Sequence, residues 1–563
     1  MLFANKKKCL ESLSALSYDE ACIDVVNQQN ESVTIFGQYE QCHKCNFQNY
    51  TVLEPYKNNS ILVYTQSPLT IFWEKDGNDN CSFTQLFYEH YRYGWNITKD
   101  CSPLYIKEPA DNAYLPIVMA FVVLFSFGTL WYMVKCVYKN SGRLRQFIAW
   151  NSELEEDLTG SAPLVIERPP SIKKHPHRIK SIDIFRGLCI MLMIFVNYGG
   201  GSYWFFQHSV WNSITIADLV FPWFMWIMGL SLAVSLQKKL YRAVPRHTLV
   251  VHIIRRSLVL IFLGIVINSS KHNLTIAELR LPGVLQRIGV TYLIVGLLEI
   301  AFTKRIEIES FSCFSDIIQA WPQWLFILVI VGFHTCITFL VDVPGCGNGY
   351  LGPGGLDDGN KHFNCTGGVT GYIDRHIFGE HMYKNPNCKK VYETTVYFDP
   401  EGILGTLMSL LTVYLGVQAG RTLNTYQNVK AKTLRWIIWG CLLSLTGGIL
   451  CEFKKDDGLI PLNKQLWSLS FVLVTAGFAF LIQAFLFVIV DIFRKWGGRP
   501  FFYPGMNAII LYVGHEIFKN TFPFGWIPTV DTHAAYLFMN LWGTALWVAI
   551  AIYLYKHDVF FTV

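Results

Sequence analysis

The chain has 563 residues, of which 52% are hydrophobic and only 16% are charged. Soluble domains carry about 25% charged residues, so this composition favours a membrane protein. The formal net charge of +6 is modest, and the basic residues gather in loops that flank apolar segments. This distribution argues against a nucleic-acid-binding protein. It favours one small soluble domain joined to a large membrane bundle.

Residues 1–112 are predicted to form a small β-rich domain, because apolar and polar residues alternate in Val33–Phe36 and Ile61–Phe72. Met1–Lys8 contains no apolar signal segment, so either the first membrane span directs translocation or the chain lacks its true beginning. Five glycosylation motifs of the form Asn-x-Ser/Thr indicate a lumenal domain, and they begin at Asn30, Asn49, Asn58, Asn80 and Asn96.

Two groups of cysteines predict structural disulfides in an oxidising compartment. They are Cys9, Cys22, Cys42, Cys45, Cys81 and Cys101, then Cys346, Cys365 and Cys388. Cys42-x-x-Cys45 also fits a zinc or redox site, but no second pair at zinc-ribbon spacing follows, so a disulfide is favoured and no metal site is predicted. Nine cysteines cannot all pair among themselves. One is therefore free, pairs with Cys451 or links two chains.

Eleven apolar stretches are long enough to be predicted as membrane-spanning helices. They are Tyr114–Tyr138, Ile184–Tyr198, Ile216–Leu236, Ile253–Asn268, Leu285–Phe302, Trp324–Leu340, Gly402–Ala419, Leu434–Cys451, Leu469–Val490, Phe501–Phe518 and Tyr536–Tyr555. The predicted fold class is therefore a polytopic α-helical membrane protein of about eleven transmembrane helices with a small β-rich lumenal N-terminal domain.

The domain order follows from loop composition. A first span at 113–138 is followed by a basic, proline-containing cytosolic linker at 139–180 and a ten-helix membrane domain at 181–563. Alternate later loops are also basic, whereas loop 199–215 has no Lys or Arg. Further glycosylation motifs fall on the side opposite the basic loops, at Asn268, Asn273 and Asn364. The N-terminus is therefore predicted to be lumenal and the C-terminus cytosolic.

The second span carries polar residues on one face. Asp183, Arg186 and Asn197 lie within roughly 60° of one another on a helix, so this face must look into the bundle. Ionisable residues inside a membrane are functional candidates. The same pattern also fits a structural ion pair with an interhelical hydrogen bond.

The loop after this span combines three glycines, Gly199–Gly201, with the aromatic run Tyr203–Phe206 and His208. Glycines let a backbone approach a ligand closely, and the aromatic rings suit either a sugar or the membrane interface. His208 is the leading candidate base of this loop, and His515-Glu516 is the next candidate.

Several long motifs resemble the heparan-α-glucosaminide N-acetyltransferase family. They include Asp183-Ile-Phe-Arg-Gly187, Val196-Asn-Tyr-Gly-Gly-Gly201, Ala217-Asp-Leu-Val-Phe-Pro-Trp223, Arg280-Leu-Pro-Gly-Val-Leu-Gln-Arg287, Asp399-Pro-Glu-Gly-Ile-Leu-Gly-Thr406 and Phe501-Phe-Tyr-Pro-Gly-Met-Asn507. The resemblance implies a lysosomal membrane enzyme that takes acetyl groups from cytosolic acetyl-CoA. The acceptor would be the terminal non-reducing glucosamine amine of heparan sulfate in the lumen. The rival class for such a chain is a multi-span transporter or channel.

The resemblance matches the family's functional histidine and asparagine to His208 and Asn197, which become the predicted catalytic residues. His208 is expected to be a general base of lowered pKa, or else a transient acetyl carrier, and Asn197 an oxyanion donor. The expected cofactor-binding residues are Arg186, Asp183, Arg178 and Lys180, and the expected substrate-binding residues are Trp204, Arg280 and Arg287. A homodimer is a further expectation, although loop Asn268–Arg280 has no cysteine to join two copies.

Overall fold

The computed structural model describes residue 9 and residues 16–75, 78–98, 101–140, 178–269, 276–303 and 314–561. Most of the predicted cytosolic linker, the N-terminal eight residues and the motif at Asn273 lie outside the described residues. The chain divides into two compact units. The first joins Met1–Ala110 to Ile179–Val563, and the second is Asp111–Arg178.

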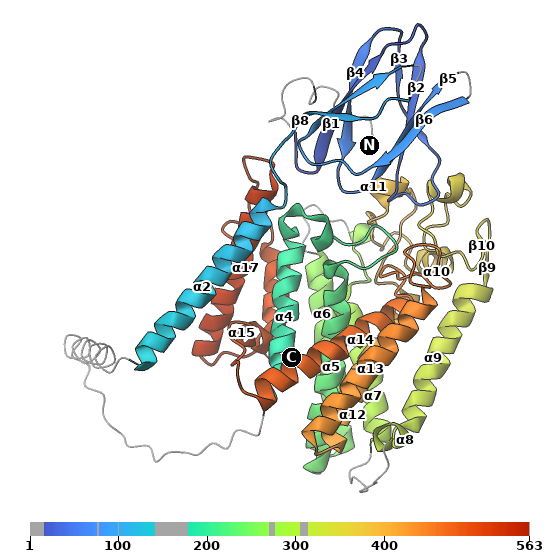
Figure 1. Cartoon of the computed structure of the whole chain (residues 1–563). Helices are drawn as coiled ribbons and strands as arrows, with labels where there is room; N and C mark the ends of the chain where they lie inside the picture. Colours follow the sequence, from blue (N-terminus) through green and yellow to red (C-terminus); the bar gives the residue numbers. More distant parts are fainter. Residues whose placement is uncertain are drawn as a thin grey trace. The chain divides into compact units, whose positions relative to one another are not determined.

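The N-terminal domain consists of two four-stranded sheets (Figure 1). One has the order β4 (Asn58–Tyr64), β1 (Glu20–Asn27), β7 (Arg92–Ile97), β8 (Tyr105–Glu108). The other has the order β3 (Gln48–Leu53), β2 (Val33–Tyr39), β5 (Leu69–Lys75), β6 (Asn78–Gln85). β1 pairs antiparallel with β4 and parallel with β7, and alternate residues from both sheets form one apolar core.

The predicted strand at Val33–Phe36 lies within β2, whereas the predicted stretch Ile61–Phe72 is two strands, β4 and β5. Pro68 stands in the bend between them. Proline has no N–H for the ladder, which explains why the apolar stretch cannot continue as one strand.

Four disulfides are present among the described residues, as the clustering of cysteines predicts. They are Cys9–Cys22, Cys42–Cys45, Cys81–Cys101 and Cys346–Cys365. Cys388 is the buried free thiol left over, and Cys451 is also free. The sequence left three alternatives for the unpaired cysteine, which were a free thiol, a bond to Cys451 or a bond between chains. The bond between Cys388 and Cys451 is not formed.

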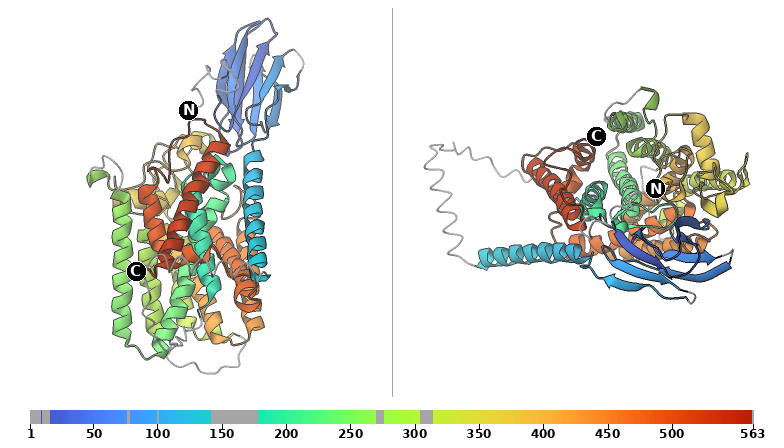
Figure 2. Two further views of the ribbon diagram at one scale, coloured as in Figure 1. Left: turned by 90° about the vertical axis from the view of Figure 1, so that its left-hand side faces the viewer. Right: turned by 90° about the horizontal axis from the view of Figure 1, so that it is seen from above.

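The bundle of the first unit is built from long helices that run side by side (Figures 1 and 2). They are α4 (Lys180–Asn197), α5 (Ile216–Tyr241), α6 (Arg246–Ser269), α7 (Val284–Phe302), α9 (Trp321–Leu340), α12 (Ile403–Thr425), α13 (Val429–Leu450), α14 (Leu469–Leu486) with η6 (Phe487–Ile492), and α17 (His533–Lys556). Shorter elements are η2 (Gly200–Ser202), η3 (Trp204–Phe206), η4 (Ile276–Glu278), α8 (Ser315–Ile318), β9 (Asp342–Val343), β10 (Gly347–Asn348), η5 (Asp357–Asn360), α10 (Gly368–Phe378), α11 (Lys389–Tyr392), α15 (Phe502–Met506) and α16 (Ala508–Phe518).

All eleven predicted spans coincide with helical segments, and the chain is a polytopic membrane protein with a β-rich N-terminal domain. Nine of the described helices are long and apolar enough to cross a membrane, including α2 (Leu115–Asn140) of the second unit. The remaining two predicted spans correspond to α4, which carries three charged residues, and to the broken pair α15 and α16. The count of eleven stays a prediction.

Close helix contacts place the polar face of α4 inside the bundle. A Cβ on Gly187 of α4 would lie 1.7 Å from the Phe501 carbonyl oxygen, and a Cβ on Gly505 of α15 would lie 1.8 Å from the Asp183 carbonyl oxygen. Only glycine at both positions lets the two backbones approach this closely. Asp183 is consequently buried at the start of α4, on the face that bears Arg186 and Asn197.

Candidate active site

His208 is held by a buried carboxylate. Its Nδ1 lies 2.8 Å from Oδ1 of Asp218, which is in the first turn of α5 and fully buried. When this carboxylate accepts the Nδ1 proton, the lone pair is on Nε2, where the Lys464 ammonium 3.3 Å away can donate to it. The arrangement is that of an imidazole oriented for general-base chemistry.

The Asp218 carboxylate is itself fixed by the start of α5. Its Oδ2 accepts hydrogen bonds from the Thr215 hydroxyl at 3.0 Å, from the Thr215 backbone N–H at 3.2 Å and from the Ser209 backbone N–H at 3.1 Å. Thr215 and Asp218 form a capping box, and the helix N-terminus favours the anionic form. The carboxylate therefore cannot swing away from His208 without uncapping α5.

Lys464, which comes from the loop before α14, completes this cluster. Its ammonium lies 2.9 Å from His208 Nδ1, 3.3 Å from Nε2 and 3.4 Å from Asp218 Oδ1. The His208 side chain is 35% exposed, so one edge of the ring remains accessible. Burial of the rest of the ring and the charge of Lys464 together lower the pKa of His208, against the opposing effect of Asp218.

Asn197, at the end of α4, belongs to a second cluster. Its amide nitrogen lies 2.9 Å from His515 Nε2 and 2.9 Å from Glu516 Oε1, both on α16. His515 Nδ1 lies 3.1 Å from the Leu511 carbonyl oxygen, which only accepts. His515 therefore carries its proton on Nδ1, and its Nε2 accepts from Asn197. No hydrogen bond joins Asn197 to His208 within the described residues.

The loop between these clusters is tightly anchored. Gly199, Gly200 and Gly201 have φ values of 122°, 59° and 69°, which side-chain-bearing residues rarely adopt. Asn540 of α17 accepts a hydrogen bond from Gly201 N–H at 2.9 Å and donates one to the Tyr198 carbonyl at 2.5 Å. The three glycines, expected to let the backbone approach a ligand, thus form a fixed turn in the segment that links Asn197 to His208.

A cavity of about 270 Å³ lies between α4, α5, α6, α7 and the α15–α16 pair. Its cationic lining residues are Arg186, Lys239 and Arg256, beside the imidazole of His252, and its apolar lining includes Met193, Met228 and Tyr512. The cations come from the first turns of α4, the last turns of α5 and the early turns of α6, which is the end that the loop charges predict to be cytosolic. Asn197 and His515 follow the lining residues Met193 and Tyr512 by about one helical turn, although they are not among the residues that line the cavity.

Arg186 is the predicted cofactor-binding residue that lines this cavity. Its guanidinium donates to Ser231 Oγ at 2.7 Å and to the Gly505 carbonyl at 3.3 Å, and it lies 3.4 Å from Asp183 Oδ1. Asp183 thus positions Arg186. Lys180 is exposed, and its backbone N–H donates to Asp491 at 3.0 Å. Arg178 is the last residue of the second unit, so its role stays a prediction.

The three predicted substrate-binding residues lie in different environments. Trp204 is 51% exposed, beside the loop that leads to His208. Arg280 makes a two-pronged contact with Asp399, at 2.8 and 2.5 Å, and also pairs with Glu401. Burial opposes its charge, but the two carboxylates hold the pKa of Arg280 above its usual value. Arg287 is 2% exposed.

Arg287 donates to the Pro400 carbonyl at 2.7 Å, whereas its Nη1 is buried and has no hydrogen-bond partner. The structure therefore brings Arg280 and Arg287 to the segment before α12, where protein groups already occupy most of their donors. Of the three predicted substrate-binding residues, Trp204 is the one that is about half exposed to solvent.

The predicted glycosylation sites differ in accessibility. Asn30, Asn49, Asn58 and Asn364 are exposed, whereas Asn96 is half-buried. Asn268 donates hydrogen bonds from its amide to the Arg280 carbonyl at 2.9 Å and to the Pro282 carbonyl at 3.0 Å, so its nitrogen is already engaged.

Asp218, Lys464 and the cavity lysine Lys239 are the site residues that reasoning from sequence missed. Asp218 lies within a motif that resembles the family, ten residues after His208, and the spacing Thr215-x-x-Asp218 indicates a capped helix start. Lys464 lies 256 residues from His208 in the chain, so only the fold brings the two together. No local pattern could have predicted that contact.

Comparison with known proteins identifies the family of this chain. Residues 178–338 match the family described as heparan-alpha-glucosaminide N-acetyltransferase, catalytic, and this segment contains Asn197, His208 and Asp218. The heparan-alpha-glucosaminide N-acetyltransferase of Mus musculus is 38% identical over 591 aligned residues, which cover 97% of this chain and 89% of the mouse protein. The Homo sapiens protein of the same name is 47% identical over 399 residues, covering 69% of this chain and 60% of the human protein. The chain therefore belongs to the heparan-alpha-glucosaminide N-acetyltransferase family and is an acetyltransferase.

Proposed function

We propose that this enzyme transfers an acetyl group from cytosolic acetyl-CoA to the terminal non-reducing glucosamine amine of heparan sulfate in the lysosomal lumen. The names of the relatives supply the acceptor, and the resemblance supplies the donor and the compartment. One observation carries the proposal best. A cavity lined by Arg186, Lys239 and Arg256 follows α4 as far as Met193, about one helical turn before Asn197.

The cationic end of the cavity suits the phosphates of acetyl-CoA. Arg186, Lys239 and Arg256 line the same cavity and come from three helices, α4, α5 and α6. Arg256 is held in place by Tyr292, whose hydroxyl lies 3.3 Å from its guanidinium and whose ring centre lies 4.6 Å away. Charge-assisted hydrogen bonds from such groups to phosphate oxygens are stronger than neutral ones. The apolar lining beyond them suits the pantetheine arm.

At the inner end, the thioester would approach Asn197. Both amide N–H groups of Asn197 are engaged by His515 and Glu516, so its role as oxyanion donor requires the acyl oxygen to displace one of these partners. His515 and Glu516 therefore enter the proposal as residues that orient the Asn197 amide before the donor binds.

The acceptor amine would be activated by His208. The amine nitrogen attacks the thioester carbonyl carbon, so an N–C bond forms and the C–S bond breaks. The amine proton passes to His208 Nε2, and CoA leaves as its thiolate. Asp218 keeps the proton of the free imidazole on Nδ1, so that Nε2 has its lone pair available. The lowered pKa of His208 favours the unprotonated form of this nitrogen.

A direct assay tests the proposal. Purified protein in detergent, which has no sealed compartments, should convert acetyl-CoA and a glucosamine-terminated heparan oligosaccharide into CoA and the N-acetylated sugar. A transporter would move a solute across vesicles but form no product in detergent. Withholding the sugar distinguishes the two chemical routes, because only a transient acetyl carrier would release CoA in a burst and retain acetyl on His208.

A further inference from the structure

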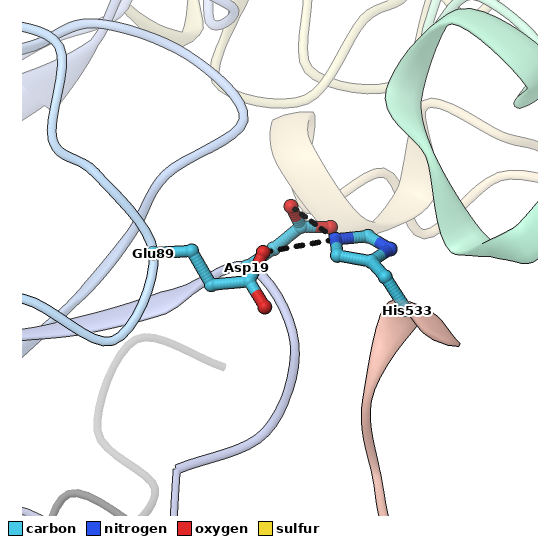
Figure 3. A group of neighbouring side chains, drawn as sticks. All are labelled: Asp19, Glu89 and His533. Carbon is cyan, nitrogen blue, oxygen red and sulfur yellow. Dashed lines mark ion pairs between the residues drawn. The ribbon is translucent and has the colours of Figure 1, made fainter. Parts of the chain in front are cut away.

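Three side chains from distant parts of the chain converge beside the anchored glycine loop (Figure 3). Asp19 immediately precedes β1, Glu89 lies in the turn before β7, and His533 is the first residue of α17. The cluster therefore joins the N-terminal β domain to the bundle. It lies outside the His208 and Asn197 clusters and plays no part in the proposed acetyl transfer.

The cluster is buried. The exposed fractions of the side chains are 13% for Asp19, 8% for Glu89 and 4% for His533. Both carboxylates face the same ring nitrogen, since His533 Nε2 lies 3.0 Å from Glu89 Oε2 and 3.4 Å from Asp19 Oδ1. Among the described residues, Glu89 Oε2 has no hydrogen-bond partner and only its ion pair with His533 Nε2. A buried carboxylate oxygen in this state needs a cation.

The other ring nitrogen decides which atom faces the carboxylates. His533 Nδ1 lies 2.8 Å from the Gly201 carbonyl oxygen, which can only accept a hydrogen bond. Nδ1 therefore carries a proton, and Nε2 faces Asp19 and Glu89 either with its lone pair, on a neutral ring, or with a second N–H, on an imidazolium. Three electron-rich atoms cannot face one another without a positive charge among them. Histidines that bind metals have this arrangement, with the second nitrogen donating to a carbonyl.

We propose that Asp19, Glu89 and His533 bind a divalent transition-metal ion that fastens the β domain to the glycine loop and α17. Zn–N and Zn–O bonds of roughly 2.0–2.2 Å in a tetrahedron place neighbouring ligand atoms roughly 3.3–3.5 Å apart. The two distances from Nε2 to the carboxylate oxygens, 3.0 and 3.4 Å, are close to that spacing. A water molecule would supply the fourth ligand.

The surroundings support the ligands as outer-shell groups support metal sites. Gln66 donates to Asp19 Oδ2 at 2.7 Å, which turns Oδ1 toward His533. Tyr203 stacks on the His533 ring with centres 4.3 Å apart and planes 8° apart, which fixes the ring orientation. His90 is another titratable residue beside the cluster, and its Nε2 lies 3.7 Å from Glu89 Oε1. It faces the carboxylate oxygen that the proposed ion does not use.

The site would stiffen the loop that precedes His208. Gly201 contacts His533 through its carbonyl and Asn540 through its N–H, and Tyr203 lies on the His533 ring. An ion that holds His533 against two residues of the β domain therefore holds this loop as well. The N-terminal domain would then have a structural role, which is to hold the loop before His208 in place. The acetyl-transfer chemistry alone does not require this domain.

Metal content tests the site without reference to activity. Full-length protein purified without a histidine tag, loaded with Zn²⁺ and then dialysed, should retain about one Zn²⁺ per chain by elemental analysis. Glu89→Gln and His533→Asn should each lower this content to near zero. His43→Asn is the matched control. His43 also connects the β domain to the bundle, but its two carboxylate neighbours face different ring nitrogens, with Asp456 near Nδ1 and Asp457 near Nε2. It should keep the wild-type metal content.

A second measurement covers variants that fold poorly. Removing the metal from the wild-type protein with a chelator should lower its melting temperature, and Zn²⁺ should restore it, because an ion that binds only the folded state stabilises it. Co²⁺ should give a visible absorption band in the wild type. If the wild type retains no more metal than Glu89→Gln and its melting temperature ignores chelator, the contact is an ion pair of a protonated imidazole and the metal site does not exist.

Discussion

His208 Nδ1 lies 2.8 Å from Asp218 Oδ1, and the same carboxylate caps the helix that begins at Ile216. The orientation of the candidate base is thus tied to the start of a membrane-spanning helix. Folding of α5 therefore fixes the tautomer of His208 before any substrate binds.

Replacing Asp218 with Asn should lower kcat by about 10²- to 10⁴-fold, because the amide can donate to Nδ1 and so favours the wrong tautomer. The KM for acetyl-CoA should change little, since Asp218 does not line the cavity. Steady-state kinetics on detergent-purified protein measure both. Thr215→Ala is the control, since it removes the cap hydroxyl at a cost of about 1 kcal/mol in stability but leaves the carboxylate. Equal losses of kcat in both variants would mean that capping alone matters.

The pH dependence should reveal the charge of Lys464. His208 acts as a base only when deprotonated, so kcat/KM falls as pH drops through its pKa. Lys464 lowers that pKa, so Lys464→Met should raise it and move the acidic limb of the profile to higher pH. Lys464→Arg keeps the charge and should keep the limb where it is. If the acidic limb of the kcat/KM profile of Lys464→Met stays at the wild-type pH, Lys464 does not influence the pKa of the catalytic base.

Neighbouring lysines on α5 offer a matched test of the donor cavity. Lys239 lines the cavity, whereas Lys238 is exposed and does not. Arg186→Gln and Lys239→Gln should each raise the KM for acetyl-CoA by about 10- to 100-fold, since each removes a charged hydrogen bond of about 1.5–3 kcal/mol. Lys238→Gln should behave as the wild type. A raised KM in all three would point to general surface charge.

The helices were predictable because membrane spans depend on local composition. All eleven apolar stretches are helical, including α4, whose charges weaken its hydropathy. The disulfide clusters followed from spacing in the same way. The turn at Pro68 was missed because strand alternation continues on both sides of it.

The site was only partly predictable. Asn197, Arg186 and His208 lie in motifs, so their chemistry was visible one residue at a time. Their partners were not, because Lys464, in a loop, is 256 residues from His208, and His515, on α16, is 318 residues from Asn197. The cluster of Asp19, Glu89 and His533 was invisible for the same reason, since no segment contains two of its members close together.

Glycan mapping tests the predicted lumenal orientation. Asn30, Asn49 and Asn58 are exposed, so Asn→Gln at each should increase gel mobility by one glycan step that disappears after enzymatic deglycosylation. Asn268→Gln should not change mobility, because its amide is engaged by two carbonyl groups. Unmodified protein from a glycosylating host would place the N-terminal domain on the cytosolic side.

The central claim is that His208 accepts the amine proton. The most direct measurement is the turnover of His208→Ala in detergent, with wild-type melting temperature and disulfide content as evidence of folding. The expected result is a loss of at least about 10²-fold in kcat with acetyl-CoA still bound, since general-base catalysis contributes about that much or more. Wild-type turnover by the folded His208→Ala protein would contradict the mechanism.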